Sequence, residues 1–111
     1  ISKPLDQMTY MGLLQTRIGD VGVKQIVAAM PNLDTLDLSG TAVSDIGMKH
    51  LAGLRQPKNL YLNNTTITDK GVMELKGIVS LRNLGLPKAS VSPAAVEKPS
   101  ASYHASVSLY P

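Results

Sequence analysis

Three aspartates recur along the chain at nearly constant spacing, and they are the first residues that could do chemistry. Asp20, Asp45 and Asp69 stand 25 and 24 residues apart. A row of carboxylates could bind a cation. If the spacing reflects stacked units, however, the carboxylates lie roughly 5 Å or more apart, too wide for one tight cage. We interpret them instead as helix first-turn residues, whose charge complements the helix dipole, and we predict no metal and no other cofactor.

Histidine, serine and cysteine give little support for catalysis. His50 and His104 are the only histidines, and neither has a second histidine or a carboxylate at helical ligand spacing. The chain has no cysteine, which excludes thiol catalysis, disulfides and zinc–thiolate sites. It also has no G-x-S-x-G motif. We predict that the protein is not an enzyme, with an esterase-like activity of a tail serine and His104 as an alternative.

Composition and charge argue against nucleic acids and membranes as partners. The net charge is +3, from 11 basic and 8 acidic residues, and the lysines and arginines are scattered singly from Lys3 to Lys98. No cluster among them resembles a nucleic-acid footprint. No apolar run approaches the roughly 20 residues of a membrane span, and no signal-peptide pattern is recognised. The sequence does not indicate a compartment.

These residues must be positioned by a repeated unit, because one spacing pattern occurs four times. The copies are Met11-x-Leu13-x-x-Thr16, Leu36-x-Leu38-x-x-Thr41, Leu60-x-Leu62-x-x-Thr65 and Leu84-x-Leu86-x-x-Ala89. The alternation L-x-L is typical of a strand, whereas Val72, Leu75 and Ile78 advance by three, as in a helix. Each unit is therefore predicted to be strand, turn, helix and turn. Stacked units would give a parallel sheet covered by a layer of helices.

The link between strand and helix repeats as well. Ser44 and Thr68 precede the aspartates and are suited to N-cap the helices that follow. In the fourth unit, Ser92 and Pro93 predict a helix start in the same place. A glycine stands two residues after each aspartate, at Gly22, Gly47 and Gly71. We attribute the glycine to a close approach between the start of the helix and the neighbouring unit.

The full pattern, L-x-x-L-x-L-x-x-T-x-[IV]-[ST]-D-x-G-h-x-x-L, covers about residues 5–98 and resembles leucine-rich repeats. More narrowly, it is similar to the bacterial 24-residue type with a T-D-x-G turn, related to GALA-type and F-box-associated repeats. The resemblance implies an α/β right-handed solenoid of about four repeats, with a parallel β-sheet on its concave side and short helices on its convex side. The chain departs from the family where Thr16, Thr41, Thr65 and Ala89 replace the usual Asn. The Thr hydroxyls are expected to satisfy backbone groups in the stacked turns, whereas Ala89 lacks a hydroxyl, so the fourth unit is expected to be looser there.

We expect one domain over residues 1–111. It comprises a partial N-terminal repeat (1–8), three repeats (9–33, 34–57 and 58–81), and a last repeat with a C-terminal cap (82–111). Val107 and Leu109 fall 23 residues after Leu84 and Leu86 and predict a final strand. An irregular loop is expected over 99–106. The uncovered N-terminal repeat suggests end-to-end self-association.

The resemblance implies that the chain is a non-catalytic module that binds a protein partner through its concave sheet surface. The predicted partner-binding residues are the outward strand positions Tyr10, Thr35, Asp37, Ser39, Asn59, Tyr61, Asn63 and Asn83. Tyr61, beside Asp37 and Asn63, is the expected centre, because tyrosine is enriched at binding hot spots. Two alternatives stay open: the substrate-recognition part of a ubiquitin-ligase adaptor, or a targeting or regulatory segment of a larger bacterial enzyme or signalling protein.

Overall fold

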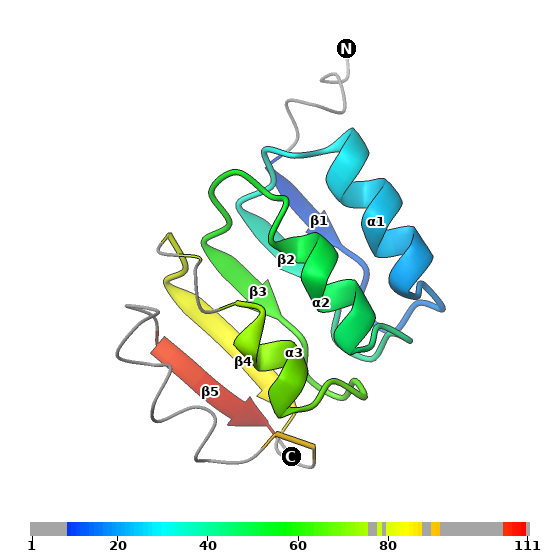
Figure 1. Ribbon diagram of the computed structural model, residues 1–111, viewed down its shortest axis with the longest axis vertical. Helices are drawn as coiled ribbons and strands as arrows, with labels where there is room; N and C mark the ends of the chain where they lie inside the picture. Colours follow the sequence, from blue (N-terminus) through cyan, green and yellow to red (C-terminus); the bar gives the residue numbers. More distant parts are fainter. Residues whose placement is uncertain (1–8, 76–77, 79, 88–89, 92–105, 111) are drawn as a thin grey trace.

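The repeats form a single parallel sheet. The computed structural model describes residues 9–75, 78, 80–87 and 90–91, together with the backbone of 106–110. Five strands pair in sequence order, and every pairing is parallel (Figure 1). The strands are β1 (Tyr10–Gly12), β2 (Thr35–Asp37), β3 (Asn59–Tyr61), β4 (Asn83–Pro87) and β5 (Ser106–Tyr110).

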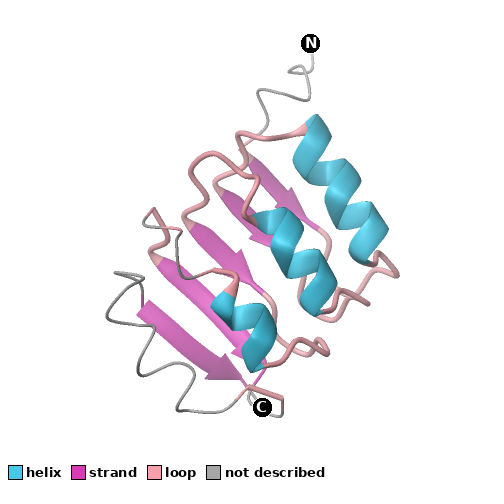
Figure 2. Cartoon of the chain, viewed as in Figure 1, coloured by secondary structure: helices cyan, strands magenta, loops and turns pink. Residues whose placement is uncertain are grey.

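Three described helices cover one face of this sheet. They are α1 (Asp20–Ala29), α2 (Asp45–Leu51) and α3 (Asp69–Met73). Figure 2 shows them side by side in front of the strands, each following the strand that precedes it in the chain. The alternation of strand and helix confirms the predicted α/β leucine-rich-repeat solenoid, in which one layer is a parallel sheet and the other is helical.

The leucine alternation determines the register of the strands. Leu36 pairs with Leu60, and Leu60 pairs with Leu84, so each strand repeats its neighbour one unit later. All three leucines are about 99% buried, as are the leucines two residues further on, Leu38, Leu62 and Leu86. Because successive strand side chains point to opposite faces, this register places all the inward leucines between the sheet and the helices.

The helices complete the same core. Val23, Met48 and Val72 occupy equivalent positions in α1, α2 and α3, and each is fully buried. In the first unit, Met11 and Leu13 are only half-buried, although they stand at positions that are sealed in the later units. β1 is an end strand of the described sheet, so among the described residues its apolar side chains have a neighbouring unit on one side only.

The third helix is shorter than the sequence pattern predicts. Helical spacing extends to Ile78, yet α3 ends at Met73. Beyond α3, the amide of Leu75 donates to the carbonyl of Val72, and the amide of Ile78 donates to the carbonyl of Leu75. These bonds span three residues, as in a 3₁₀ helix, so apolar side chains three residues apart can still share a face without a long α-helix.

The predicted final strand is confirmed. In β5, Val107 pairs with Leu84, and Leu109 pairs with Leu86. Ser106 belongs to this strand, so it does not lie in the irregular loop expected over 99–106. The rest of that loop, the helix start at Pro93, the partial repeat 1–8 and Ala89 lie outside the described residues.

Truncating Leu62 should therefore destabilise the fold strongly. Leu62 is 1% exposed, so Leu62→Ala is expected to lower the free energy of unfolding by about 2–5 kcal/mol. Tyr61→Ala, at the last residue of β3 and on the opposite face of the sheet, should cost much less. Urea unfolding followed by circular dichroism measures both. Equal losses in the two variants would mean that the inward and outward faces are assigned wrongly.

Candidate functional site

The strand register brings most of the predicted partner-binding residues onto one face of the sheet. Thr35, Asn59 and Asn83 form one row across β2, β3 and β4, and Asp37 pairs with Tyr61 in a second row. Tyr10 pairs with Thr35 at the β1 end and is 61% exposed. The residues of the two rows are half-buried, except Asn83, which is exposed. The sheet thus presents two parallel polar rows to solvent.

The first row is a chain of side-chain hydrogen bonds, which we call the polar ladder (Thr35, Asn59 and Asn83). The amide of Asn83 donates to Oδ1 of Asn59 over 2.7 Å, and the amide of Asn59 donates to Oγ1 of Thr35 over 2.9 Å. The Thr35 hydroxyl in turn donates to Oδ1 of Asp34 over 3.0 Å. These contacts set the orientation of both amides. The ladder is therefore a preorganised surface with much of its hydrogen-bonding capacity already used.

The second row has an aromatic ring beside a carboxylate. A glycine flanks this pair on each side, since Gly12 pairs with Asp37 and Gly85 pairs with Tyr61. The backbone amide of Ser39 donates to Oδ1 of Asp37 over 3.0 Å, which holds that carboxylate in place. With no side chain at Gly85, Tyr61 has no neighbouring side chain in this row on the β4 side. A ring placed in this way can bury apolar area against a partner.

Ser39 does not belong to the accessible face, which corrects the sequence-based prediction. It is 5% exposed, and its hydroxyl oxygen accepts a hydrogen bond from the backbone amide of Asn63. The physical reason is that β2 ends at Asp37 and the chain turns through Gly40, whose φ is +71°. Ser39 therefore supports the next turn. Asn63 is half-buried, and its Oδ1 accepts no hydrogen bond from any described residue.

The recurring aspartates join adjacent units. Oδ1 of Asp20 accepts hydrogen bonds from the backbone amides of Ser44 (2.7 Å) and Gly47 (3.0 Å), and Oδ2 accepts from the Ser44 hydroxyl. In the same way, Oδ1 of Asp45 accepts a hydrogen bond from the backbone amide of Thr68, and Oδ2 accepts one from the Thr68 hydroxyl. Ser44 and Thr68 also cap α2 and α3, as predicted. We call this arrangement the aspartate clasp.

The clasp accounts for carboxylates that could otherwise suggest a metal site. Two of the three aspartates already bind two donor groups or more of the next unit. Across the part of the chain that the structure describes, no group of three or more His, Cys, Asp or Glu side chains is placed to hold a metal ion. His50 lies half-buried in α2.

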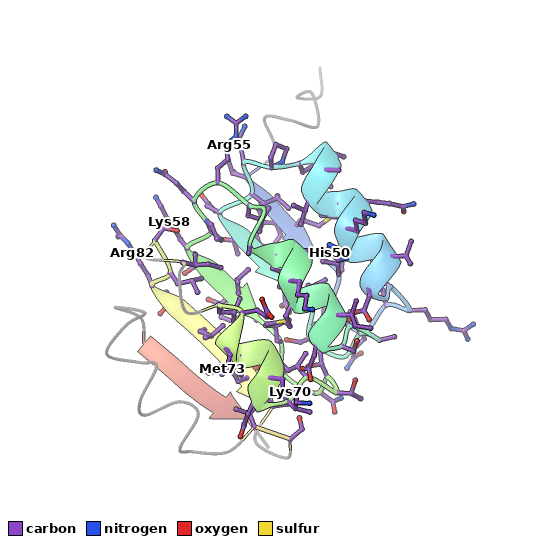
Figure 3. All side chains as sticks on the ribbon, in the orientation of Figure 1. His50, Arg55, Lys58, Lys70, Met73 and Arg82 are labelled. Atoms are coloured by element: carbon purple, nitrogen blue, oxygen red, sulfur yellow. The ribbon has the colours of Figure 1, made fainter. Side chains whose placement is uncertain are left out.

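A cluster of cations that the sequence pattern did not reveal lies at the edge where the strands begin. Arg55, Lys58 and Arg82 are exposed, and Figure 3 shows them along one edge of the molecule. Lys58 lies 3 residues after Arg55 and 24 residues before Arg82, so in the sequence the three look like scattered charges. The signal that could have found them is that Lys58 and Arg82 hold the same position in successive repeats. A surface pocket of about 360 Å³ lies beside them, lined by Asn32, Asp34, Arg55, Gln56 and Lys58.

Comparison with known families supports the architecture. Residues 29–52 match the family model described as Leucine Rich repeat, a segment that runs from the end of α1 through β2 and α2. No curated protein matches the sequence of the chain. Domains of this family are generally protein–protein interaction modules and typically non-catalytic. None of the described helices is long and apolar enough to span a bilayer.

The clasp makes a specific prediction for the glycine that follows each aspartate. A Cβ on Gly47 would lie 2.5 Å from Oδ1 of Asp20 and 2.6 Å from Cγ2 of Val43. Alanine normally favours a helix over glycine by up to about 1 kcal/mol. Because the clash displaces a carboxylate with several partners, Gly47→Ala should instead lower the free energy of unfolding by roughly 1–3 kcal/mol.

The matched control is Gly22→Ala in α1. A Cβ there would clash with Cγ1 of Ile18, so the substitution must displace a half-buried apolar side chain but breaks no hydrogen bond of the clasp. Thermal and urea unfolding should show a smaller loss for Gly22→Ala than for Gly47→Ala. A loss of the same size at both glycines would mean that the clasp does not set the requirement for glycine.

Proposed function

We propose that the protein is a non-catalytic module that binds a protein partner through the concave face of its sheet, with Tyr61 and Asp37 at the centre. The observation that carries the proposal is the register of β2 with β3, which sets the half-buried side chain of Tyr61 beside a fixed carboxylate. The polar ladder runs parallel to this pair. A partner segment crossing the strands would meet both rows.

The surface is suited to this role because it is ordered before binding. Each strand is hydrogen-bonded to its neighbours, and the outward side chains rest on a core that is sealed beneath them. A preordered surface loses little conformational entropy on association. Tyr61 combines an apolar ring with a hydroxyl, the combination that concentrates affinity at interfaces.

Several finer assignments go with this proposal. The repeats would be of the bacterial 24-residue type with unit boundaries at 9–33, 34–57 and 58–81, and the remaining partner contacts would come from Tyr10, Thr35, Asn59, Asn63 and Asn83. The adaptor and enzyme-segment hypotheses would use the same face for recognition, so one experiment tests the binding step that all of them share.

Replacing Tyr61 and Asp37 by alanine should remove the partner and spare the fold. Pull-down from a native lysate, quantified by mass spectrometry, would compare the wild type with this double variant. The protein captured by the wild type should bind the variant at least about tenfold more weakly, as for a hot-spot pair. Met73→Ala is the control, because Met73 is 49% exposed on the helical side. Undiminished capture by the double variant would contradict the proposal.

We also propose that the β1 end supports association with a second copy. Beside the half-buried Met11 and Leu13, Leu14 is 57% exposed, which leaves apolar surface at that end of the described sheet. Leu14→Glu should lower the dimer fraction in sedimentation velocity across a concentration series. Ile46→Glu is the control, since Ile46 is 63% exposed on α2. A wild type that stays monomeric throughout the series would rule the association out.

A further inference from the structure

We infer that the partner carries an acidic segment and that Arg55, Lys58 and Arg82, here called the basic rim, bind it. The inference rests on the proposed function, because the rim borders the sheet face that would hold the rest of the partner. Asn59 directly follows Lys58, and Asn83 directly follows Arg82, so the rim continues into the polar ladder.

Backbone hydrogen bonds fix the rim residues on adjacent repeats. The carbonyl of Lys58 accepts from the amides of Arg82 (2.7 Å) and Asn83 (3.0 Å), and the amide of Lys58 donates to the carbonyl of Asp34 over 2.7 Å. The amide of Arg55 donates to the carbonyl of Pro31 over 2.9 Å. Lys58 and Arg82 therefore start about one strand spacing, roughly 5 Å, apart. This is close enough for both to contact successive carboxylates of one peptide.

The three charges are available to a partner. Their side chains are exposed and take part in no hydrogen bond or ion pair with other described residues. Like charges held at this spacing repel each other, and a bound anion relieves that repulsion. Guanidinium groups also bind carboxylates through two parallel hydrogen bonds, which gives Arg55 and Arg82 a geometric preference for them.

The groove between α2 and α3 has no comparable preference for an anionic ligand. It has a volume of about 430 Å³ and is lined by Asp45, Ile46, Lys49, Lys70, Met73 and Glu74. Two carboxylates balance two ammonium groups there. The basic rim, by contrast, has only Asp34 as an acidic neighbour in its pocket. Charge complementarity therefore points to the rim.

Because the basic rim has only three cations, it is better suited to an acidic peptide than to a nucleic acid. Tight binding of a duplex usually involves about six to ten phosphate contacts, and single strands need aromatic side chains on which bases stack. The rim residues are flanked by amides and a carboxylate (Asn59, Asn83 and Asp34). Amides can donate hydrogen bonds to the backbone carbonyls of a peptide whose acidic side chains meet the cations.

Asp34 also orients the segment. In successive repeats, one rim position holds Asp34, Lys58 and Arg82, so the charge changes from negative to positive toward β4. An acidic segment should lie over Lys58 and Arg82 and away from Asp34. Replacing Asp34 by asparagine keeps the Oδ1 acceptor for the Thr35 hydroxyl and removes the repulsion. Asp34→Asn should therefore bind the segment about twofold more tightly, a gain that misfolding cannot produce.

The probe is a fluorescein-labelled peptide of alternating Glu and Ser, measured by fluorescence anisotropy at about 0.15 M ionic strength, where surface charges act over roughly 8 Å. The test variant combines Arg55→Gln, Lys58→Gln and Arg82→Gln. The control variant combines Lys24→Gln, Lys49→Gln and Lys70→Gln, three exposed lysines on the helices. Each variant removes three positive charges from a net charge of +3, so total charge is matched.

The rim variant should weaken binding by about tenfold, and the control variant by less than about threefold. If both variants bind the peptide equally weakly, net charge alone explains the effect and the inference is overturned. Absence of measurable binding by the wild type would also overturn it, as would tighter binding of oligothymidylate carrying the same charge. Circular dichroism melting verifies that each variant is folded.

The captured partner separates this inference from the proposed function. If partner binding is lost in the Tyr61 and Asp37 double variant but unchanged in the rim variant, the acidic-segment inference fails and the proposed function stands. If neither variant changes capture, the concave-face function fails as well.

Discussion

The stacking of one leucine on the equivalent leucine of the next unit is the constraint on which the structure depends. A single strand–turn–helix unit has too little surface to enclose its own apolar residues, so it folds only against a neighbour. Leu36, Leu60 and Leu84 enforce a shift of one full repeat between adjacent strands. A slip of one residue would turn those side chains to solvent. The arrangement of every polar group on the surface follows from this register.

The aspartate clasp is the polar counterpart of the leucine stack. Each carboxylate reaches the N-cap of the following helix, satisfies backbone amides that would otherwise lack a partner, and stands where the helix dipole favours a negative charge. The contact excludes a Cβ at Gly47 and also at Gly71, which abuts Asp45. Aspartate and glycine therefore recur together, because the carboxylate of one unit occupies the space that a Cβ would fill at the glycine of the next unit. The pair secures the helical side and leaves the sheet face free to vary.

The sequence predicted those features that depend on spacing within a unit. Alternating leucines determined the strands and their inward face, and Thr41 and Thr65 were expected to satisfy turn backbone, as their bonds to Leu38 and Leu62 confirm. Features that depend on contacts between units were harder to predict. The 24-residue interval from Asp20 to Ser44 shows that the pattern recurs, but it does not identify the bonding partner. The burial of Ser39 depends on a turn at Gly40 with a positive φ, which outward alternation along a strand does not reveal.

The two rows of the sheet face differ in what they can contribute to binding. Asn59 and Asn83 each use one of their two amide N–H donors within the polar ladder, so fewer of their hydrogen bonds remain for a partner. Such groups discriminate between partners, because a poorly matched one leaves amides unpaired. Net affinity must come from groups whose capacity is unused in the free protein. Such groups are Tyr61, which is only half-buried, and the cations Arg55, Lys58 and Arg82, whose side chains bond to no other described residue. In the proposed binding mode, affinity and selectivity thus come from neighbouring but different side chains on the same register of strands.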